Sequence, residues 1–299
     1  MKKTVRMLGL CALVALAFTA CKKNDTNGKV KFTATINQPS SNERTYIANL
    51  DANGSKVLRW AGGEEINLFN KALTENNHMP FVVLDYNNKH AYFEGDSQFL
   101  AGMGTPNNYI AFYPNAVENT DGLVEMTIPD QQSYSMFKVA NEIYPMYGFN
   151  TTDYNIDFHS HVGVLGLRFR LDPGVYGNYE SSVEIPLQKI ILTGFNNAGT
   201  GDADVLAGTM VYDLDGNYTM VNTGNVIELT GGSLNNQNFT EFDFILPEGA
   251  LANGFTVQII RDNGTSITYE GKSVSEGGQA IVAERITYMP EIYVIKTFE

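Results

Sequence analysis

The chain has 299 residues, of which 43% are hydrophobic, and its formal net charge is −13. Such an acidic surface repels nucleic acid and anionic lipid, so we expect no nucleic-acid partner. The length suits one large domain or two domains of about 140 residues each.

The first twenty residues have the features of a secretory signal. A short cationic start is followed by residues 7–18, an apolar run too short to span a bilayer. Two small residues then lead into Cys21, in a pattern similar to a bacterial lipobox. We predict that the chain is cut before Cys21, that palmitate or a similar acyl chain is attached there, and that the protein is an outer-membrane lipoprotein. The alternative is an ordinary secreted protein with a coincidental cysteine.

Residues 21–28 are polar and lack periodicity, as expected of a tether between a lipid and a domain. From residue 30 the pattern becomes a strict alternation. Val30, Phe32, Ala34 and Ile36 point to one side, and polar residues separate them. The sequence therefore predicts a half-buried strand over residues 30–36.

The same alternation recurs along the whole chain, and turn residues separate the runs. The further predicted strands are 56–60, 65–70, 80–86, 109–113, 123–128, 162–171, 185–192, 206–214, 226–229, 239–246, 254–260, 266–269, 281–288 and 292–298. No window of helical length has a 3.6-residue period, so the predicted class is all-β. About fifteen short strands fit two β-sandwiches better than one.

A segment of low periodicity, residues 135–157, divides the chain into similar halves. We place the domain boundary near residue 155. The predicted organisation is a signal peptide over 1–20, a tether over 21–28, an N-terminal β-sandwich over 29–155 and a C-terminal β-sandwich over 156–299.

Five segments, in this order, carry a resemblance to a known family. They are V-L-R-W-A-G-G-E-E-I-N-L-F at 57–69, I-P-D-Q-Q-S-Y at 128–134, Y-P-M-Y-G at 144–148, F-H-S-H-V-G-V-L-G-L-R-F at 158–169, and F-D-F-I-L-P-E-G with G-F-T-V at 242–249 and 254–257. Together they are similar to the fimbrillin family, the subunits and accessory proteins of type V pili of Gram-negative anaerobes. Gly63-Glu64 stands where the family has Gly-Asp, and the fourth segment has an altered spacing.

The resemblance implies two tandem transthyretin-like (Greek-key) β-sandwich domains and a structural or adhesive role in a fimbrium on the cell surface, without enzymatic activity or cofactor. It also implies assembly with other pilus subunits by β-strand addition, after an arginine-specific protease removes the first strand. Residues 30–36 are then the exchangeable strand, and Arg44 in its polar loop is the predicted maturation site. Arg59 is the runner-up because it lies within a predicted strand, and residues 291–299 are a candidate donor strand.

Other residues suggest chemistry more weakly. Asp157, His159 and His161 alternate on one predicted strand, and His-x-His is a metal-ligand spacing. No fourth ligand is indicated, so we favour a structural role and keep the metal site as the alternative. The sole tryptophan, Trp60, suits a core position better than a sugar platform.

Two other classes of function stay open. A glycan-binding outer-membrane lipoprotein of a polysaccharide-utilisation system would share the lipobox and the acidity. An enzyme is not indicated, because the sequence has no Gly-x-Ser-x-Gly elbow and no isolated pair of carboxylates.

Overall fold

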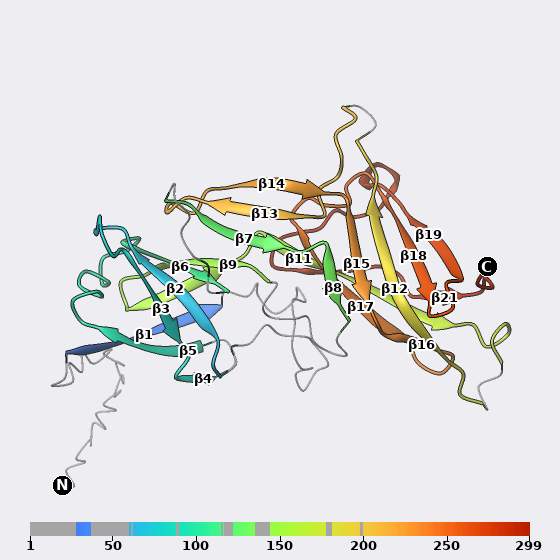
Figure 1. The fold of residues 1–299 in the computed structure, drawn as a ribbon, viewed down its shortest axis with the longest axis horizontal. Helices are drawn as coiled ribbons and strands as arrows, with labels where there is room; N and C mark the ends of the chain where they lie inside the picture. Colours follow the sequence, from blue (N-terminus) through green and yellow to red (C-terminus); the bar gives the residue numbers. More distant parts are fainter. Residues whose placement is uncertain are drawn as a thin grey trace, which may run out of the picture.

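The described part of the chain is built almost entirely from β-strands (Figure 1). The computed structural model describes residues 28–36, 60, 62–87, 90–114, 116, 122–134, 144–177, 181–197 and 200–299. Within these ranges the helical structure is one 3₁₀ turn, Val274–Glu276. The predicted all-β class is confirmed.

The described strands are β1 Lys29–Ile36, β2 Glu65–Asn70, β3 His78–Val82, β4 Asp85–Asn87, β5 His90–Asp96, β6 Tyr109–Tyr113, β7 Val124–Ile128, β8 Gln131–Ser133, β9 Met146–Asn150, β10 Asn155–His159, β11 Val162–Leu171, β12 Glu184–Gly194, β13 Ala207–Tyr212, β14 Tyr218–Gly224, β15 Val226–Thr230, β16 Ser233–Asn235, β17 Thr240–Pro247, β18 Phe255–Arg261, β19 Ser266–Gly271, β20 Ile286–Tyr288 and β21 Ile292–Val294. Strands such as β5 and β7 alternate buried and more exposed side chains, whereas β2, β6 and most of β11 are buried on both faces. In the described residues no helix has the length and apolarity that a membrane span requires.

One eight-stranded sheet organises the first half of the chain. Its order is β3-β2-β6-β9-β10-β1-β5-β4, so β1 lies inside the sheet and not at its edge. The inward side chains form a hydrophobic cluster rich in aromatic rings, and Phe69, Phe112 and Phe158 in it are fully buried. Apolar burial of this kind is the main favourable contribution to folding.

The second half of the chain forms a β-sandwich. One sheet has the order β17-β11-β20, with β21 also paired to β11, and the other has the order β19-β18-β12-β15-β8, with β16 paired to β12. Leu167 and Phe244 from the first sheet and Ile190 and Val257 from the second share one hydrophobic cluster. The two sheets therefore pack face to face, as alternation of apolar residues on both requires.

Two short segments tie the halves together. β7, from the first half, pairs with β13 of the β13–β14 hairpin, and Figure 1 shows these three strands spanning the middle of the molecule. β8 adds in parallel to β15. Through β7 the two halves of the chain share a three-stranded sheet, and through β8 they share one edge of the sandwich.

Gln132 explains why the I-P-D-Q-Q-S-Y segment holds this position. It is buried, and its side-chain amide donates to the carbonyl of Ile245 (3.0 Å) while its carbonyl accepts from the Ile245 amide (3.0 Å). One side chain thus satisfies both backbone groups of a residue in β17, which a buried strand requires.

The hairpin tip is fixed on the first half of the chain. Asp213 accepts hydrogen bonds from the backbone amides of Asp215 and Asn217, both at 2.9 Å, and Gly216 takes the left-handed φ of +82° that the turn needs. Lys71, which follows β2, pairs with Asp215 at 2.6 Å. Residues 213–217 therefore form a hairpin turn whose carboxylates are used in the turn and in the pair with Lys71.

Several predicted strands have different bounds in the structure. The predicted strand 80–86 is two strands, β3 and β4, and the predicted strand 281–288 is paired only over β20. The segment 135–157, which we predicted to separate two domains, contains β9 and the start of β10 in the centre of the eight-stranded sheet. These two strands are only five residues long each, so their alternation gives a weak signal.

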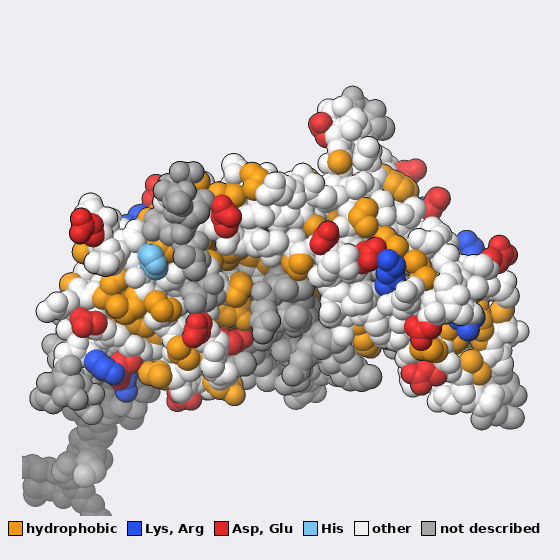
Figure 2. Space-filling view, viewed as in Figure 1, with side chains coloured by type: hydrophobic (Ala, Val, Ile, Leu, Met, Phe, Trp, Pro, Cys, Tyr) orange, Lys and Arg blue, Asp and Glu red, His pale blue; other side chains and the backbone are white. Residues whose placement is uncertain are grey.

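That the chain forms two domains with a boundary near residue 155 remains a prediction. The buried residues of the second cluster all lie beyond 155, but the first cluster also includes residues from beyond that point, namely Ile156, Phe158, Val162, Val164, Met210, Tyr212, Ile245 and Ile286. On the face shown in Figure 2, Lys and Arg side chains are few and do not merge into one patch.

Candidate functional site

The first strand is held on both of its edges. β1 pairs antiparallel with β5, from Lys29 opposite Asp96 to Thr35 opposite His90. It also pairs in parallel with β10, from Thr33 opposite Asn155 onward. Withdrawal of β1 would expose unpaired backbone groups on β5 and β10 at the same time.

The inward face of β1 fills a row of apolar sites. Phe32, Ala34 and Ile36 are buried, and Val30 is partly buried against the same cluster. The Phe32 ring stacks on Phe93, with centroids 5.1 Å apart and planes at 11°, and it meets a second ring, Phe81, edge-on at 5.2 Å. The inward-facing row predicted from the alternation is therefore present, with Phe32 as its largest contact.

The outward face of β1 has its own polar anchor. Asn155, the first residue of β10, accepts hydrogen bonds through its Oδ1 from the hydroxyls of Thr33 (2.7 Å) and Thr35 (2.8 Å). An ion pair joins Lys29 to Glu94 at 2.9 Å, but the Lys29 side chain is 60% exposed. The pair contributes little, because solvent screens it, so the register rests on the backbone ladder, the apolar row and Asn155.

The residues predicted for processing and lipid attachment, Cys21, Arg44 and Arg59, lie outside the described residues. β1 ends at Ile36, and the two arginines fall in the part of the chain between β1 and Trp60. Their roles remain predictions.

Trp60 is a core residue. It is 2% exposed and packs edge-on against Phe93, Tyr113 and Phe158, at centroid distances of 6.1, 5.4 and 5.3 Å. Since Phe93 is also the stacking partner of Phe32, Trp60 lies one ring away from β1. The preference for a core position over a sugar platform is confirmed.

The last two strands occupy one edge of β11. β20 pairs in parallel with Val164–Gly166 and β21 with Phe169–Leu171. Each is three residues long, and the edge of β21 away from β11 has no strand partner in the described part of the chain. Short parallel edge strands are held weakly by their backbone alone.

Side chains strengthen the attachment of β21. Arg168 Nη1 lies 2.7 Å from Glu291 Oε1. The guanidinium of Arg170 lies 4.7 Å from the ring centroid of Phe239 and 4.6 Å from that of Tyr293, and its Nη2 donates to the Tyr293 hydroxyl at 2.6 Å. We call these five residues the arginine clamp. The clamp is not among the sites predicted from the sequence, although two arginines two positions apart in an apolar strand are a visible signal.

The rest of the last segment, residues 291–299, crosses to the other sheet. Val294 is fully buried, and Phe298 packs against the same cluster. Lys296 Nζ donates to the carbonyl of Thr268 (3.2 Å), and the backbones of Ser266 and Glu299 exchange hydrogen bonds. The last segment therefore closes one side of the sandwich from β11 to β19.

The structure does not gather the predicted metal ligands. His159 Nδ1 lies 3.1 Å from Glu284 Oε1, and Asp157 accepts from the Asn155 amide. The His161 ring instead stacks on Tyr147, with centroids 4.9 Å apart and planes at 8°. In the described ranges no group of three or more His, Cys, Asp or Glu side chains could hold a metal ion.

The two histidines have opposite electrostatic surroundings. The hydrogen bond to Glu284 raises the pKa of His159. Burial lowers the pKa of His161, whose ring lies between Tyr147 and Tyr218 of the β13–β14 hairpin and whose Nε2 is buried with no hydrogen-bond partner. Glu248 and Glu284 act against this lowering without cancelling it.

These shifts predict opposite pH dependence for two variants. The stability due to His159 is fully present below the unfolded pKa of about 6.5 and is lost as the pH rises through its raised pKa, whereas the stability due to neutral His161 is lost as the pH falls below about 6.5. We expect the melting temperature of His161→Phe to rise relative to wild type when the pH is lowered from about 7.5 to about 5.5, and that of His159→Gln to fall. Thermal denaturation of the three proteins at both pH values tests this, and equal responses would contradict it.

Comparison with known proteins gives the fold. No family model matches the sequence, and no curated protein matches it. A solved structure of a proposed cell adhesion protein from Bacteroides uniformis is similar over 89% of this chain and 95% of its own, with a TM-score of 0.50 and 13% identity. The chain therefore shares the all-β fold of that structure.

Two further structures are more distant. A proposed cell adhesion protein from Bacteroides ovatus matches 85% of this chain and 87% of its own, with a TM-score of 0.46 and 14% identity. The tip fimbrial protein Mfa3 from Porphyromonas gingivalis matches 81% of each chain, with a TM-score of 0.31 and 10% identity.

Proposed function

We propose that this protein is a structural and adhesive fimbrillin-like subunit, or an accessory protein, of a surface fimbrium, and that it has no enzymatic role. The observation that carries the proposal is the position of β1, an N-terminal strand in the interior of a sheet with an apolar row beneath it. The fold shared with a proposed cell adhesion protein supports the same class.

The physical basis is β-strand addition. A sheet that lacks an interior strand offers backbone donors and acceptors on two facing edges, and apolar sites spaced two residues apart select an alternating partner strand. The sites filled by Phe32, Ala34 and Ile36 have this spacing. A strand from a second subunit with the same alternation would restore both ladders.

The last segment is the proposed donor. β21 is short, lies at a sheet edge and is held by the arginine clamp on an exposed surface. Lipid on Cys21 is the proposed link to the outer membrane, where more than one acyl chain would give a firm anchor.

Maturation at Arg44 tests the role in assembly. We expect an arginine-specific protease to cut the purified precursor after Arg44, and N-terminal sequencing to give a new terminus at Thr45. Filaments in electron micrographs after cleavage would support a stalk role. Arg44→Ala should block cleavage, and the matched variant Arg59→Ala should not.

A precursor that stays intact, or that is cut without ever forming polymers, would contradict assembly by removal of β1. An anchor or tip position would then require another route of strand addition. The glycan-binding alternative would need an exposed aromatic platform; the sole tryptophan is 2% exposed, which leaves tyrosines such as Tyr86 and Tyr92 as the exposed rings for that role.

A further inference from the structure

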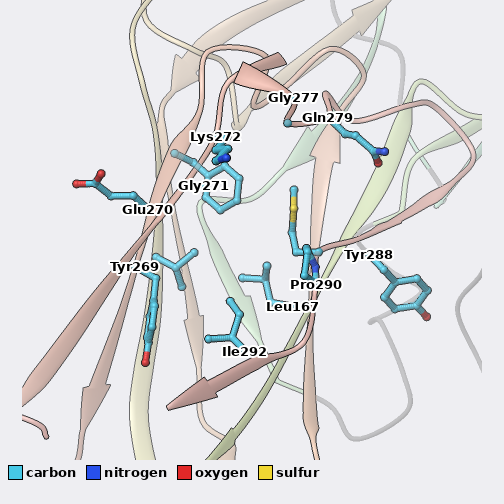
Figure 3. Close-up of a pocket in the computed structure, with 14 residues that line it drawn as sticks. Leu167, Tyr269, Glu270, Gly271, Lys272, Gly277, Gln279, Tyr288, Pro290 and Ile292 are labelled. Atoms are coloured by element: carbon cyan, nitrogen blue, oxygen red, sulfur yellow. The ribbon is translucent and has the colours of Figure 1, made fainter. Parts of the chain in front are cut away.

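A pocket of about 710 Å³ opens on the side of the sandwich next to the last segment (Figure 3). It lies between β19, the outermost strand of one sheet, and the β20–β21 connection on the other sheet. The turn that follows β19 forms its upper end. Concave sites of roughly 300–1,000 Å³ are the usual size for small-molecule ligands.

An extra residue in the β20–β21 connection creates the space. Gly166 of β11 pairs with Tyr288, and Phe169 pairs with Ile292. Three steps on β11 therefore face four on the partner, so the chain bulges between the two pairs. Pro290 lies in the bulge and has no amide to donate, so it cannot continue the ladder.

Glycines widen the opposite wall. A Cβ on Gly271 would lie 2.2 Å from the Phe255 ring, so this position accepts no side chain without a shift of the ring. Gly277 and Gly278 in the following turn also line the pocket. The bulge on one side and these glycines on the other therefore leave the apolar residues between them accessible.

The interior of the pocket is apolar. The buried core residues Leu167, Val257 and Phe255 line it, together with Met289 and Ile292. The Tyr269 ring lines the lower end, and Figure 3 shows its hydroxyl directed away from the pocket. Burial raises the pKa of Tyr269 to about 12, so this phenol adds no negative charge near neutral pH.

One cation lies at the mouth. Lys272 is exposed and is the only Lys or Arg among the described residues that line the pocket. Its ammonium forms no ion pair or hydrogen bond with the described chain. Figure 3 shows the Glu270 carboxylate pointing away from the pocket. The Glu276 carboxylate accepts from the Ser273 hydroxyl at 2.8 Å, and its pKa is lowered mainly by hydrogen bonds to Ser273 and less by the charge of Lys272.

We propose that this pocket binds an amphiphile with an aliphatic body and a carboxylate head, the body resting on Leu167, Val257 and Met289 and the head meeting Lys272. The pocket is separate from the acceptor strand β1, but Ile292 of the proposed donor strand β21 lines it, so the site belongs to the state in which β21 is paired with β11. Transfer of each methylene from water to such a lining is favourable, and the lone ammonium selects an anionic head over a neutral one.

Isothermal titration of the full chain with dodecanoate, kept below its micellar concentration, tests the proposal. We expect saturable binding that is weakened at least about tenfold by Met289→Trp, whose indole fills the pocket. Lys272→Gln should weaken dodecanoate about fivefold and leave dodecanol unchanged, because only the carboxylate uses the ammonium. Lys189→Gln is the matched control, since Lys189 lies on β12 of the same sandwich, pairs with Glu228 at 2.9 Å and does not line the pocket.

Three results would overturn the proposal. They are absence of saturable binding to wild type, equal binding by wild type and Met289→Trp with unchanged melting temperatures, and an equal effect of the two lysine variants. Flotation with anionic phospholipid vesicles distinguishes a free amphiphile from a lipid surface as the ligand. Binding to vesicles alone, without binding of free dodecanoate, would identify a surface effect and also overturn the pocket.

Discussion

A Phe32→Ala variant is expected to lose about 3–5 kcal/mol of unfolding free energy, the range found when a large aromatic side chain is removed from a packed core. Phe32 is 2% exposed and contacts the rings of both Phe93 and Phe81. Its removal leaves a cavity between strands β1, β3 and β5 that those rings cannot easily fill. Urea denaturation followed by Trp60 fluorescence measures the loss, because Trp60 packs on Phe93.

Lys31→Ala is the matched control on the same strand. Lys31 points outward and is exposed, so we expect a change within about 0.5 kcal/mol. If the two variants had similar midpoints, the inward row of β1 would not hold the strand in place. The proposed exchange would then lack the apolar sites on which it depends.

Removal of the last segment is expected to have the second large effect. A chain that ends at Pro290 loses Val294, which is fully buried, together with the partly buried Ile292 and Phe298. Their burial corresponds to about 3–6 kcal/mol of unfolding free energy. The truncated protein should denature at a lower urea concentration when followed by circular dichroism.

The same truncation tests whether the last segment can act as a donor. A labelled peptide of residues 291–299 should bind the truncated protein, because the edge of β11 and the site of Val294 are vacant, and should not bind the full chain. Fluorescence anisotropy measures both. A Val294→Asp peptide should bind at least about tenfold more weakly, since its carboxylate would enter an apolar site. Equal binding to the truncated and full chains would contradict a donor role.

The two predictions address the two ends of one proposed assembly. β1 is an interior strand with neighbours on both edges, and β21 is an edge strand with a neighbour on one. A donor that leaves an edge costs fewer backbone hydrogen bonds than an acceptor that loses an interior strand. This asymmetry suits β21 to spontaneous exchange and β1 to removal by proteolysis.

The functional residues were only partly visible in the sequence. The alternation identified the inward row of β1, and the core position of Trp60 was predicted from the strand that the family resemblance gives it. The spacing of His159 and His161 predicted that both rings share a face and could bind a metal, but each ring contacts a different neighbouring side chain. Glu284 binds one ring and Tyr147 stacks on the other, and both contacts join residues from different strands or turns.

The sequence by itself determined the all-β class and the bounds of strands such as β2, β6 and β11, because a short apolar run between turn residues is a local property that each strand carries in its own side chains. Only the tertiary structure decided that β7 joins the β13–β14 hairpin, that β1 lies inside its sheet, and that the arginine clamp and the pocket form beside β21. These features depend on which strand edges pair with one another, and the paired strands are far apart in the sequence. A two-residue period specifies the buried face of a strand but not the neighbour at its edge.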